Sequence, residues 1–202
     1  MNDSILNDIQ IFDDLIDEQT LSSLHSKIQS SPFTFDTTGG NRNHKYPPGK
    51  HSNGGYRFWG MTLLQRLNDT ITYNDVKDPK LFETVLDIFE WFNKGYLNSS
   101  MFIHRVHING QTIGQDGGIH LDEGWPDCYS LMIFPNFNWK PEWGGEFEVY
   151  SSDKEDGKLI RKIDYIPGRI ILFNGHIPHR GLSPSVPNIL RTSLIYKCQK
   201  IK

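Results

Sequence analysis

The stretch Arg169-Ile170-Ile171-Leu172-Phe173-Asn174-Gly175 is a short apolar run that ends at an Asn-Gly turn. Runs of this kind, bounded by turn residues, are typical of buried strands. Similar runs lie at 101–107, 129–134, 146–150, 159–165 and 190–197. After Gly95 the chain therefore predicts a series of strands, which is the pattern of a double sheet of the jelly-roll type.

The N-terminal half carries helical patterns. A short strand at 9–12 precedes a helix that begins after Asp17, an N-cap residue, and ends near Ser30. A second helix is predicted from Pro79, a residue favoured at the first helical position, to Gly95 as its stop. Both have apolar residues at helical spacing, so each needs a surface to cover. We predict an α+β protein with helices packed on the outside of one sheet.

Length and composition place limits on the domain and on its partners. A chain of 202 residues suits one domain, with residues 1–100 as helical support and a substrate loop and residues 101–198 as the sheet core. The hydrophobic fraction of 37% is enough for a packed interior. A net charge of −3 argues against an overall electrostatic grip on nucleic acid. Nothing in the pattern indicates an oligomeric state.

Cysteine use and the N-terminus indicate a cytoplasmic protein. Cys128 and Cys198 are too few for a disulfide framework and lack the spacing of a zinc knuckle, so both are expected to be reduced. The acidic N-terminus has no basic region followed by an apolar run, and no segment approaches the roughly 20 apolar residues of a membrane span. The absence of alanine suggests an AT-rich genome such as that of a virus or phage, which places the chain in a host cytoplasm.

Three residues predict a metal centre. In a strand, residues i and i+2 share a face, so His120 and Asp122 can converge on one point. Alone, this His-x-Asp pair is weak, because on the order of one such match is expected by chance. His179 follows the apolar strand 169–173, where a second strand end can meet the first. Two histidines and one carboxylate are the ligand set of non-haem Fe(II) oxygenases, whereas structural zinc prefers four closed ligands.

Other histidines compete for places in the site. His176 is the rival third ligand, and we favour His179 because Asn174-Gly175 turns the chain just before His176. His104 and His107 point to opposite faces of their strand, so they cannot both enter one pocket. His107 is the better pocket candidate, with a satisfied core histidine as the alternative.

Arg191 is a candidate carboxylate clamp. An arginine within an apolar strand is costly to bury unless it meets an anion, and its guanidinium matches a carboxylate with two parallel hydrogen bonds. Ser193, two residues later, shares its face and can donate to the same carboxylate. The alternative is that Arg191 pairs with a structural Asp or Glu.

These motifs together resemble the 2-oxoglutarate/Fe(II) oxygenase superfamily, and in particular its prolyl 4-hydroxylase-like branch. The resemblance covers roughly the C-terminal half, and five motifs occur in the family's order: His120-Leu121-Asp122, Trp143-Gly144-Gly145-Glu146, Pro167-Gly168-Arg169 with Phe173, His179 with Pro184, and Arg191-Thr192-Ser193. Five ordered motifs are far more specific than any one of them.

The resemblance implies a double-stranded β-helix (jelly-roll, cupin-like) and a dioxygenase with a stated set of cofactors. It implies Fe(II) at His120, Asp122 and His179, and 2-oxoglutarate with its distal carboxylate on Arg191, assisted by Ser193. It also implies O2 as co-substrate, succinate and CO2 as products, and ascorbate as reductant. Related hydroxylases commonly hold the co-substrate with a tyrosine that precedes the His-x-Asp pair. Here the corresponding strand ends in His107, which becomes the candidate for that contact.

The expected substrate is a peptidyl proline. The segment 39–60 is rich in Gly, Asn, Pro and aromatics, including Tyr56 and Trp59, and Trp143 lies near the other motifs. Aromatic walls and exposed backbone suit an extended protein or peptide segment. Basic residues in the same loop leave a nucleic-acid oxygenase open, although the overall acidity disfavours it. A small-molecule oxygenase and a non-catalytic jelly-roll binding module are the remaining alternatives.

Overall fold

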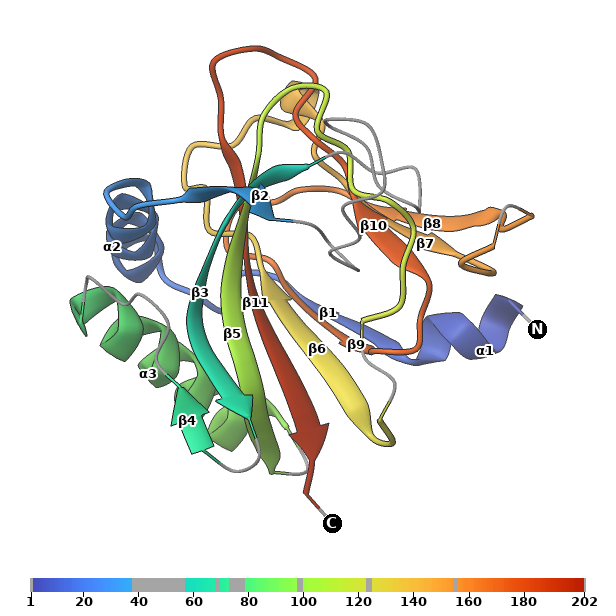
Figure 1. Ribbon diagram of the computed structural model, residues 1–202, viewed down its shortest axis with the longest axis horizontal. Coiled ribbons are helices and arrows are strands. Elements are labelled where there is room, and N and C mark those ends of the chain that lie inside the picture. Colours follow the sequence, from blue (N-terminus) through green and yellow to red (C-terminus); the bar gives the residue numbers. More distant parts are fainter. Residues whose placement is uncertain are drawn as a thin grey trace.

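The computed structural model describes residues 2–37, 57–67, 70–72, 79–97, 100–122, 125–154 and 156–201. Within them, an eight-stranded sheet and a three-stranded sheet face each other, and every pairing between strands is antiparallel (Figure 1). The larger sheet has the order β1 (Ile9–Phe12), β9 (Ile170–Asn174), β6 (Cys128–Ile133), β11 (Arg191–Lys200), β5 (Met101–Gln111), β3 (Phe58–Leu67), β2 (Thr34–Thr37), with β4 (Thr70–Thr72) on β3. The smaller sheet has the order β10 (His179–Gly181), β7 (Phe147–Tyr150), β8 (Leu159–Ile163).

Two helices cover the outer face of the larger sheet, as predicted. They are α2 (Glu18–Gln29) and α3 (Pro79–Tyr96), which lie side by side in Figure 1. The Asp17 side chain accepts a hydrogen bond from the Thr20 backbone N–H at 2.9 Å, so the predicted N-cap starts α2. Tyr196 of β11 donates to the Val85 carbonyl of α3 at 2.7 Å and ties helix to sheet. The remaining helices are short: α1 (Asn2–Asn7) and the 3-10 turn η1 (Pro141–Trp143).

The alternation of side chains along the strands produces two apolar clusters. The helix-side cluster contains Leu194 and Tyr196 of β11 together with the apolar face of α3. The second cluster lies between the two sheets and includes Ile171 and Phe173 of β9 with Phe147 of β7. The central strands β9, β6 and β11 are therefore buried on both faces along most of their length, which explains the nearly continuous apolar run at 169–173. The structure confirms the predicted double sheet.

Several elements differ from the sequence prediction. β5 continues to Gln111 instead of ending at 107, because Asn109-Gly110 extends the strand. A Cβ at Gly110 would lie 3.0 Å from Phe33 Cε1, so this glycine serves close packing and not a turn. β3 and β10 were not predicted. β10 has the sequence His-Arg-Gly, with no apolar pattern, and owes its conformation to pairing with β7.

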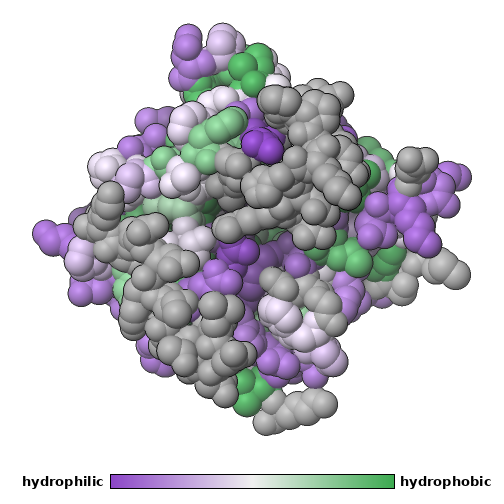
Figure 2. Space-filling view, viewed as in Figure 1, coloured by the Kyte–Doolittle hydropathy of each residue, from purple (hydrophilic) through white to green (hydrophobic). Residues whose placement is uncertain are grey.

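The first hundred residues contribute strands β1 to β4 as well as helices. Most of the predicted substrate loop at 39–60, with Tyr56, lies outside the described residues. In the part of the chain that the structure describes, no helix is both long enough and apolar enough to cross a membrane. Seen from the same side in Figure 2, hydrophilic atoms occupy the middle of the face and apolar ones lie in separate patches around it.

Candidate metal centre

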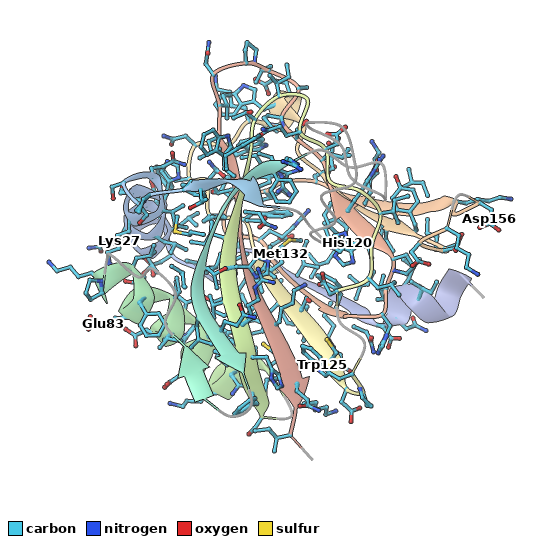
Figure 3. All side chains as sticks on the ribbon, viewed as in Figure 1. Lys27, Glu83, His120, Trp125, Met132 and Asp156 are labelled. Atoms are coloured by element: carbon cyan, nitrogen blue, oxygen red, sulfur yellow. The ribbon has the colours of Figure 1, made fainter. Side chains whose placement is uncertain are left out.

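His120 and His179 are held opposite each other by a short antiparallel bridge. Each backbone N–H donates to the carbonyl of the other residue at 3.0 Å, and the imidazole centroids are 4.4 Å apart. The backbone N–H of Asp122 donates to the Gly175 carbonyl at 2.9 Å, which anchors the carboxylate beside both rings. One ligand atom from each of the three residues lies within 4.8 Å of the others. Figure 3 shows His120 between the two sheets.

The hydrogen bonds of both imidazoles leave Nε2 available for a metal. Nδ1 of His120 lies 2.9 Å from the Gly118 carbonyl oxygen, and Nδ1 of His179 lies 2.7 Å from that of Ile177. A carbonyl can only accept, so Nδ1 carries the proton in the neutral ring and Nε2 keeps its lone pair. Burial lowers the pKa of His179 below its usual value, which keeps that ring neutral. The donor set fits a divalent iron with open positions.

Asp122 divides its two oxygens between different partners. Oδ1 is 3.3 Å from Nε2 of His120 and 3.3 Å from Nε2 of His179. Oδ2 accepts from the Ser130 hydroxyl and forms an ion pair with the Lys197 ammonium. Burial alone would raise the pKa of Asp122, but the positive charge of Lys197 beside the carboxylate holds it well below its usual value. The carboxylate is therefore ionised, as a metal ligand must be.

Arg191 lies farther along the same inner face and is almost wholly buried, with 1% of its surface exposed. Its Nε donates to the Gly145 carbonyl at 2.8 Å, and Nη1 donates to Oε1 of Gln111 at 2.9 Å and to Ser193 Oγ at 3.4 Å. Nη2 is buried and has no hydrogen-bond partner among the residues that the structure describes. Among the described residues no carboxylate forms an ion pair with Arg191, so the structural alternative has no partner here.

The guanidinium is held in a fixed position by aromatic rings. Its central carbon is 5.4 Å from the ring centroid of Phe134 and 5.2 Å from that of Tyr165. Burial lowers the pKa of Arg191 to about 10, so the group remains charged at neutral pH. An unpartnered N–H on a buried cation is rare and costly, and a carboxylate would satisfy it. Arg191 is therefore fitted to the acidic end of a ligand.

Gly145 explains why a glycine pair precedes Glu146. Its φ is +82°, in the left-handed region, and a Cβ there would lie 2.9 Å from Trp139 Cζ2 and 3.2 Å from Arg191 Cδ. A larger residue would displace the guanidinium or the indole. The Gly-Gly motif thus makes room for Arg191.

A polar strip connects the Arg191 end with the histidines. On β5, His107, Asn109 and Gln111 alternate onto the inner face, opposite Ile195, Ser193 and Arg191 of β11. His107 Nδ1 and Asn109 Oδ1 are buried, and within the described part of the chain neither has a hydrogen-bond partner. Burial, with the positive charges of Arg105 and Lys197, holds the pKa of His107 well below its usual value, so this ring is neutral. Three unpartnered polar atoms on one strip indicate a polar ligand beside the candidate metal centre.

The remaining sequence candidates fall in different places. His176 is exposed and lines a surface groove of about 450 Å³ together with Leu121, apart from the His120–Asp122–His179 cluster. Trp143 packs edge-on against Trp139, with 5.5 Å between the ring centroids. Trp59 pairs with Gly110 and contacts Phe35, on the helix-covered face of the sheet and not on the face of His107. Tyr56 lies outside the described residues.

Sequence reasoning did not single out Gln111, Ser130 and Lys197. The hydroxyl in an otherwise apolar strand was a signal for Ser130, because a buried polar group needs a partner. Alternation was a signal for Lys197, since residues 191, 193, 195 and 197 share one face. The role of Gln111 depends on its pairing with Arg191 across two strands, which only the register reveals.

Known structures share this fold. No family model and no curated protein matches the sequence. A 2OG-Fe(II) oxygenase family oxidoreductase from Burkholderia pseudomallei aligns with a TM-score of 0.61 and 18% identity, over 98% of this chain and 89% of that one. A Pseudomonas putida prolyl-4-hydroxylase aligns with a TM-score of 0.61 and 14% identity, over 100% of both chains.

A third similar structure is a prolyl hydroxylase from Trichoplax adhaerens in complex with a peptide fragment of the hypoxia inducible factor oxygen degradation domain. It aligns with a TM-score of 0.58 and 15% identity, over 98% of this chain and 88% of that one. At such identities the likeness shows the fold. The chain therefore has the jelly-roll fold of the 2OG-Fe(II) oxygenases, in agreement with the resemblance of its motifs.

Proposed function

We propose that this chain is an Fe(II)- and 2-oxoglutarate-dependent dioxygenase that hydroxylates a peptidyl proline. The observation that carries the proposal is the unpartnered Nη2 of buried Arg191 on the same inner face as the His120–Asp122–His179 cluster. A structural metal site needs no such cation nearby. A co-substrate with a carboxylate at each end needs a cationic hydrogen-bond donor for its distal carboxylate and a metal for its other end.

The residues of the chain would share the work of binding. His120, Asp122 and His179 would hold the iron through Nε2, Oδ1 and Nε2, and leave its other positions open. Iron bound there supplies the activation of O2 and the oxidative decarboxylation of 2-oxoglutarate to succinate and CO2, coupled to hydroxylation of the substrate. Arg191 would donate from Nη2 to the distal carboxylate, and Ser193 would donate from its hydroxyl.

The pocket walls would exclude water from the co-substrate. Phe134 and Tyr165 stack at 4.2 Å between ring centroids, and Trp139 lies 4.5 Å from Tyr165, so the Arg191 end is closed by aromatic rings. His107 and Asn109 would offer polar contacts along the length of the co-substrate. His107 would thereby serve where related hydroxylases use a tyrosine. A dry and ordered pocket strengthens each hydrogen bond to the carboxylates.

The choice of a peptidyl proline rests on the similar structures and on the amino-acid composition of one segment. Two of the similar structures are prolyl hydroxylases, and one of them holds a peptide. The aromatic-rich segment at 39–60 is the candidate for contacts with such a peptide. Trp143 belongs to the aromatic packing behind Arg191, which suits it to support the pocket.

The test is product analysis by mass spectrometry. Purified protein with Fe(II), 2-oxoglutarate and ascorbate as reductant is incubated in air with proline-bearing peptides, free proline and methylated oligonucleotides. We expect a peptide that gains the mass of one oxygen atom, with succinate formed in parallel. His179→Ala should abolish both, whereas His176→Ala should retain both.

Demethylated oligonucleotide in place of modified peptide would move the substrate class to nucleic acid. No O2-dependent succinate with any substrate, from protein that binds iron, would refute the dioxygenase proposal.

A further inference from the structure

Lys197 is an unusual neighbour for a metal centre. It is only 5% exposed, and its ammonium contacts Asp122 Oδ2 and donates to Ser130 Oγ at 3.1 Å. A buried lysine is costly unless an opposite charge and hydrogen bonds compensate it. A cation beside a metal ligand also repels the metal that the ligand would bind. A lysine here therefore needs an explanation beyond simple metal binding.

The two oxygens of Asp122 suggest that explanation. Oδ1 faces both histidine Nε2 atoms, at 3.3 Å from each. Oδ2 is taken by the Ser130 hydroxyl and the Lys197 ammonium, and Lys197 and Ser130 also contact each other. A carboxylate whose second oxygen is held by two donors cannot easily rotate to give both oxygens to one metal. Asp122 is thus fixed as a ligand with one oxygen.

We propose that Lys197, with Ser130, is a positioning residue that restricts Asp122 to one metal–oxygen bond and so keeps a coordination position open for the co-substrate. This inference rests on the proposed function. A six-coordinate iron with three protein ligands has three positions left, two for the chelating keto acid and one for O2. A second oxygen from Asp122 would occupy one of them.

The position of Lys197 on β11 supports this role. Arg191, Ser193, Ile195 and Lys197 alternate onto the inner face, so one strand presents a cation at the co-substrate end and another at the metal end. Ser130 lies directly across from Lys197 on β6. The clamp is therefore built from two paired strands in the centre of the larger sheet, where backbone hydrogen bonds fix both residues.

The proposal predicts opposite changes in two affinities. Without the ammonium, the repulsion on the metal disappears and Asp122 can offer both oxygens, so the metal should bind at least as tightly. The co-substrate then has to displace one of these oxygens, so it should bind more weakly. A purely structural role for Lys197 predicts instead that metal affinity and folding stability fall together.

The experiment compares Lys197→Met, Lys197→Arg and Ser130→Ala with wild type under anaerobic conditions. Mn(II) is titrated into each metal-free protein by calorimetry, and 2-oxoglutarate is then titrated into the Mn(II)-loaded protein. We expect Lys197→Met to bind Mn(II) at least as tightly as wild type and 2-oxoglutarate about tenfold or more weakly, the size of effect typical for groups that orient metal ligands. Lys197→Arg should restore most of the 2-oxoglutarate affinity.

Lys94→Met is the matched control, because Lys94 is exposed and forms an ion pair with Glu90 on α3, far from the candidate metal centre in the chain. Both of its affinities should equal those of wild type. If Lys197→Met fails to fold, Ser130→Ala carries the test, with the same signs and a smaller effect.

Unchanged 2-oxoglutarate affinity in Lys197→Met would overturn the inference. Weaker Mn(II) binding in this variant than in wild type would overturn it as well. Failure of wild type to bind 2-oxoglutarate in the presence of Mn(II) would instead overturn the proposed function itself.

Discussion

The two faces of β11 are both buried but are built from different chemistry. The helix-side face carries Leu194 and Tyr196, which pack against α3 and leave no polar atom without a partner. The inner face carries Arg191, Ser193 and Lys197, and its guanidinium keeps a buried N–H unpartnered. Because side chains alternate along a strand, one backbone holds both faces in register. Under the proposed function, alternate residues of β11 would serve stability and ligand binding.

The difference between the two faces indicates that unpartnered buried polar atoms mark the functional face of a buried strand. A face selected for stability alone would pair every buried polar group. On the inner face, atoms of Arg191, Asn109 and His107 remain unpartnered, along one strip that leads to the histidines. A polar ligand, as proposed above, would supply the partners that these atoms lack. If this separation holds, substitutions on the two faces should affect different measurements.

The largest expected effect is on the helix-side face. Leu194 is fully buried in the core beneath α3, so Leu194→Ala should lower the free energy of unfolding by about 2–5 kcal/mol. The affinity of the folded protein for Mn(II) and 2-oxoglutarate should not change. Urea unfolding and calorimetry measure the two quantities. A decrease in the free energy of unfolding of less than about 1 kcal/mol would show that this face does not carry the stability.

Arg191→Met tests the opposite face. The variant should weaken 2-oxoglutarate binding by about 2–3 kcal/mol, because charge-assisted hydrogen bonds to the distal carboxylate are lost. Its unfolding free energy should stay within about 1 kcal/mol of wild type, since methionine fills part of the volume and no unpartnered cation remains. Mn(II) affinity should be retained. A variant that unfolds but binds 2-oxoglutarate normally would reverse the assignment of the two faces.

Gly145→Ala should affect both measurements moderately. The left-handed backbone at Gly145 and the close approach of Trp139 and Arg191 make any side chain unfavourable. We expect a loss of about 1–2 kcal/mol in stability and weaker 2-oxoglutarate binding as Arg191 shifts. Thermal unfolding and calorimetry provide the readouts. Gly95→Ala is the control, because a Cβ there meets nothing within 4 Å and its φ is not left-handed.

The smallest effect is expected at the rim of the larger sheet, where Asp13 directly follows β1 and Arg169 directly precedes β9. These two residues form an ion pair. Arg169 donates to both carboxylate oxygens, at 2.7 Å and 2.8 Å. The hydrogen bonds from Arg169 lower the pKa of Asp13, so the pair stabilises the fold above the unfolded pKa and this contribution is lost as pH falls through the lower folded pKa. Asp13 is partly exposed, so solvent screening limits the contribution to about 0.5 kcal/mol.

Asp13→Asn should therefore be slightly less stable than wild type at neutral pH, and the difference should vanish as the pH falls below the lowered pKa of Asp13. Urea unfolding across the pH range measures it. A difference that grows on acidification would contradict the sign, and any change in 2-oxoglutarate affinity would show that the rim and the inner face are coupled.

Sequence patterns predicted the elements whose conformation is determined locally. The apolar run at 169–173 and the N-cap Asp17 are recognisable without tertiary context, and both appear as predicted. β10 has no such pattern in its sequence, because its strand conformation comes from pairing with β7. The sequence ends the strand of β5 at His107, because the close packing of Gly110 against the ring of Phe33 involves a residue far away in the sequence.

The same distinction applies to the candidate site. His120 with Asp122, and Arg191 with Ser193, are two residues apart, so alternation alone places each pair on one face. Gln111, Ser130 and the Lys197 clamp depend on which strands become neighbours, and a single sequence does not specify that register. The sequence therefore predicts which neighbours along a strand share a face, and it leaves out the partners that lie on other strands.

The most direct test of the account is a crystal structure of the protein with Mn(II) and 2-oxoglutarate. The account predicts Mn(II) bound by Nε2 of His120, one oxygen of Asp122 and Nε2 of His179, with the distal carboxylate of 2-oxoglutarate on Nη2 of Arg191. Lys197 should remain on the other oxygen of Asp122. Mn(II) bound elsewhere, or a co-substrate that leaves Arg191 Nη2 without a partner, would contradict the central claim.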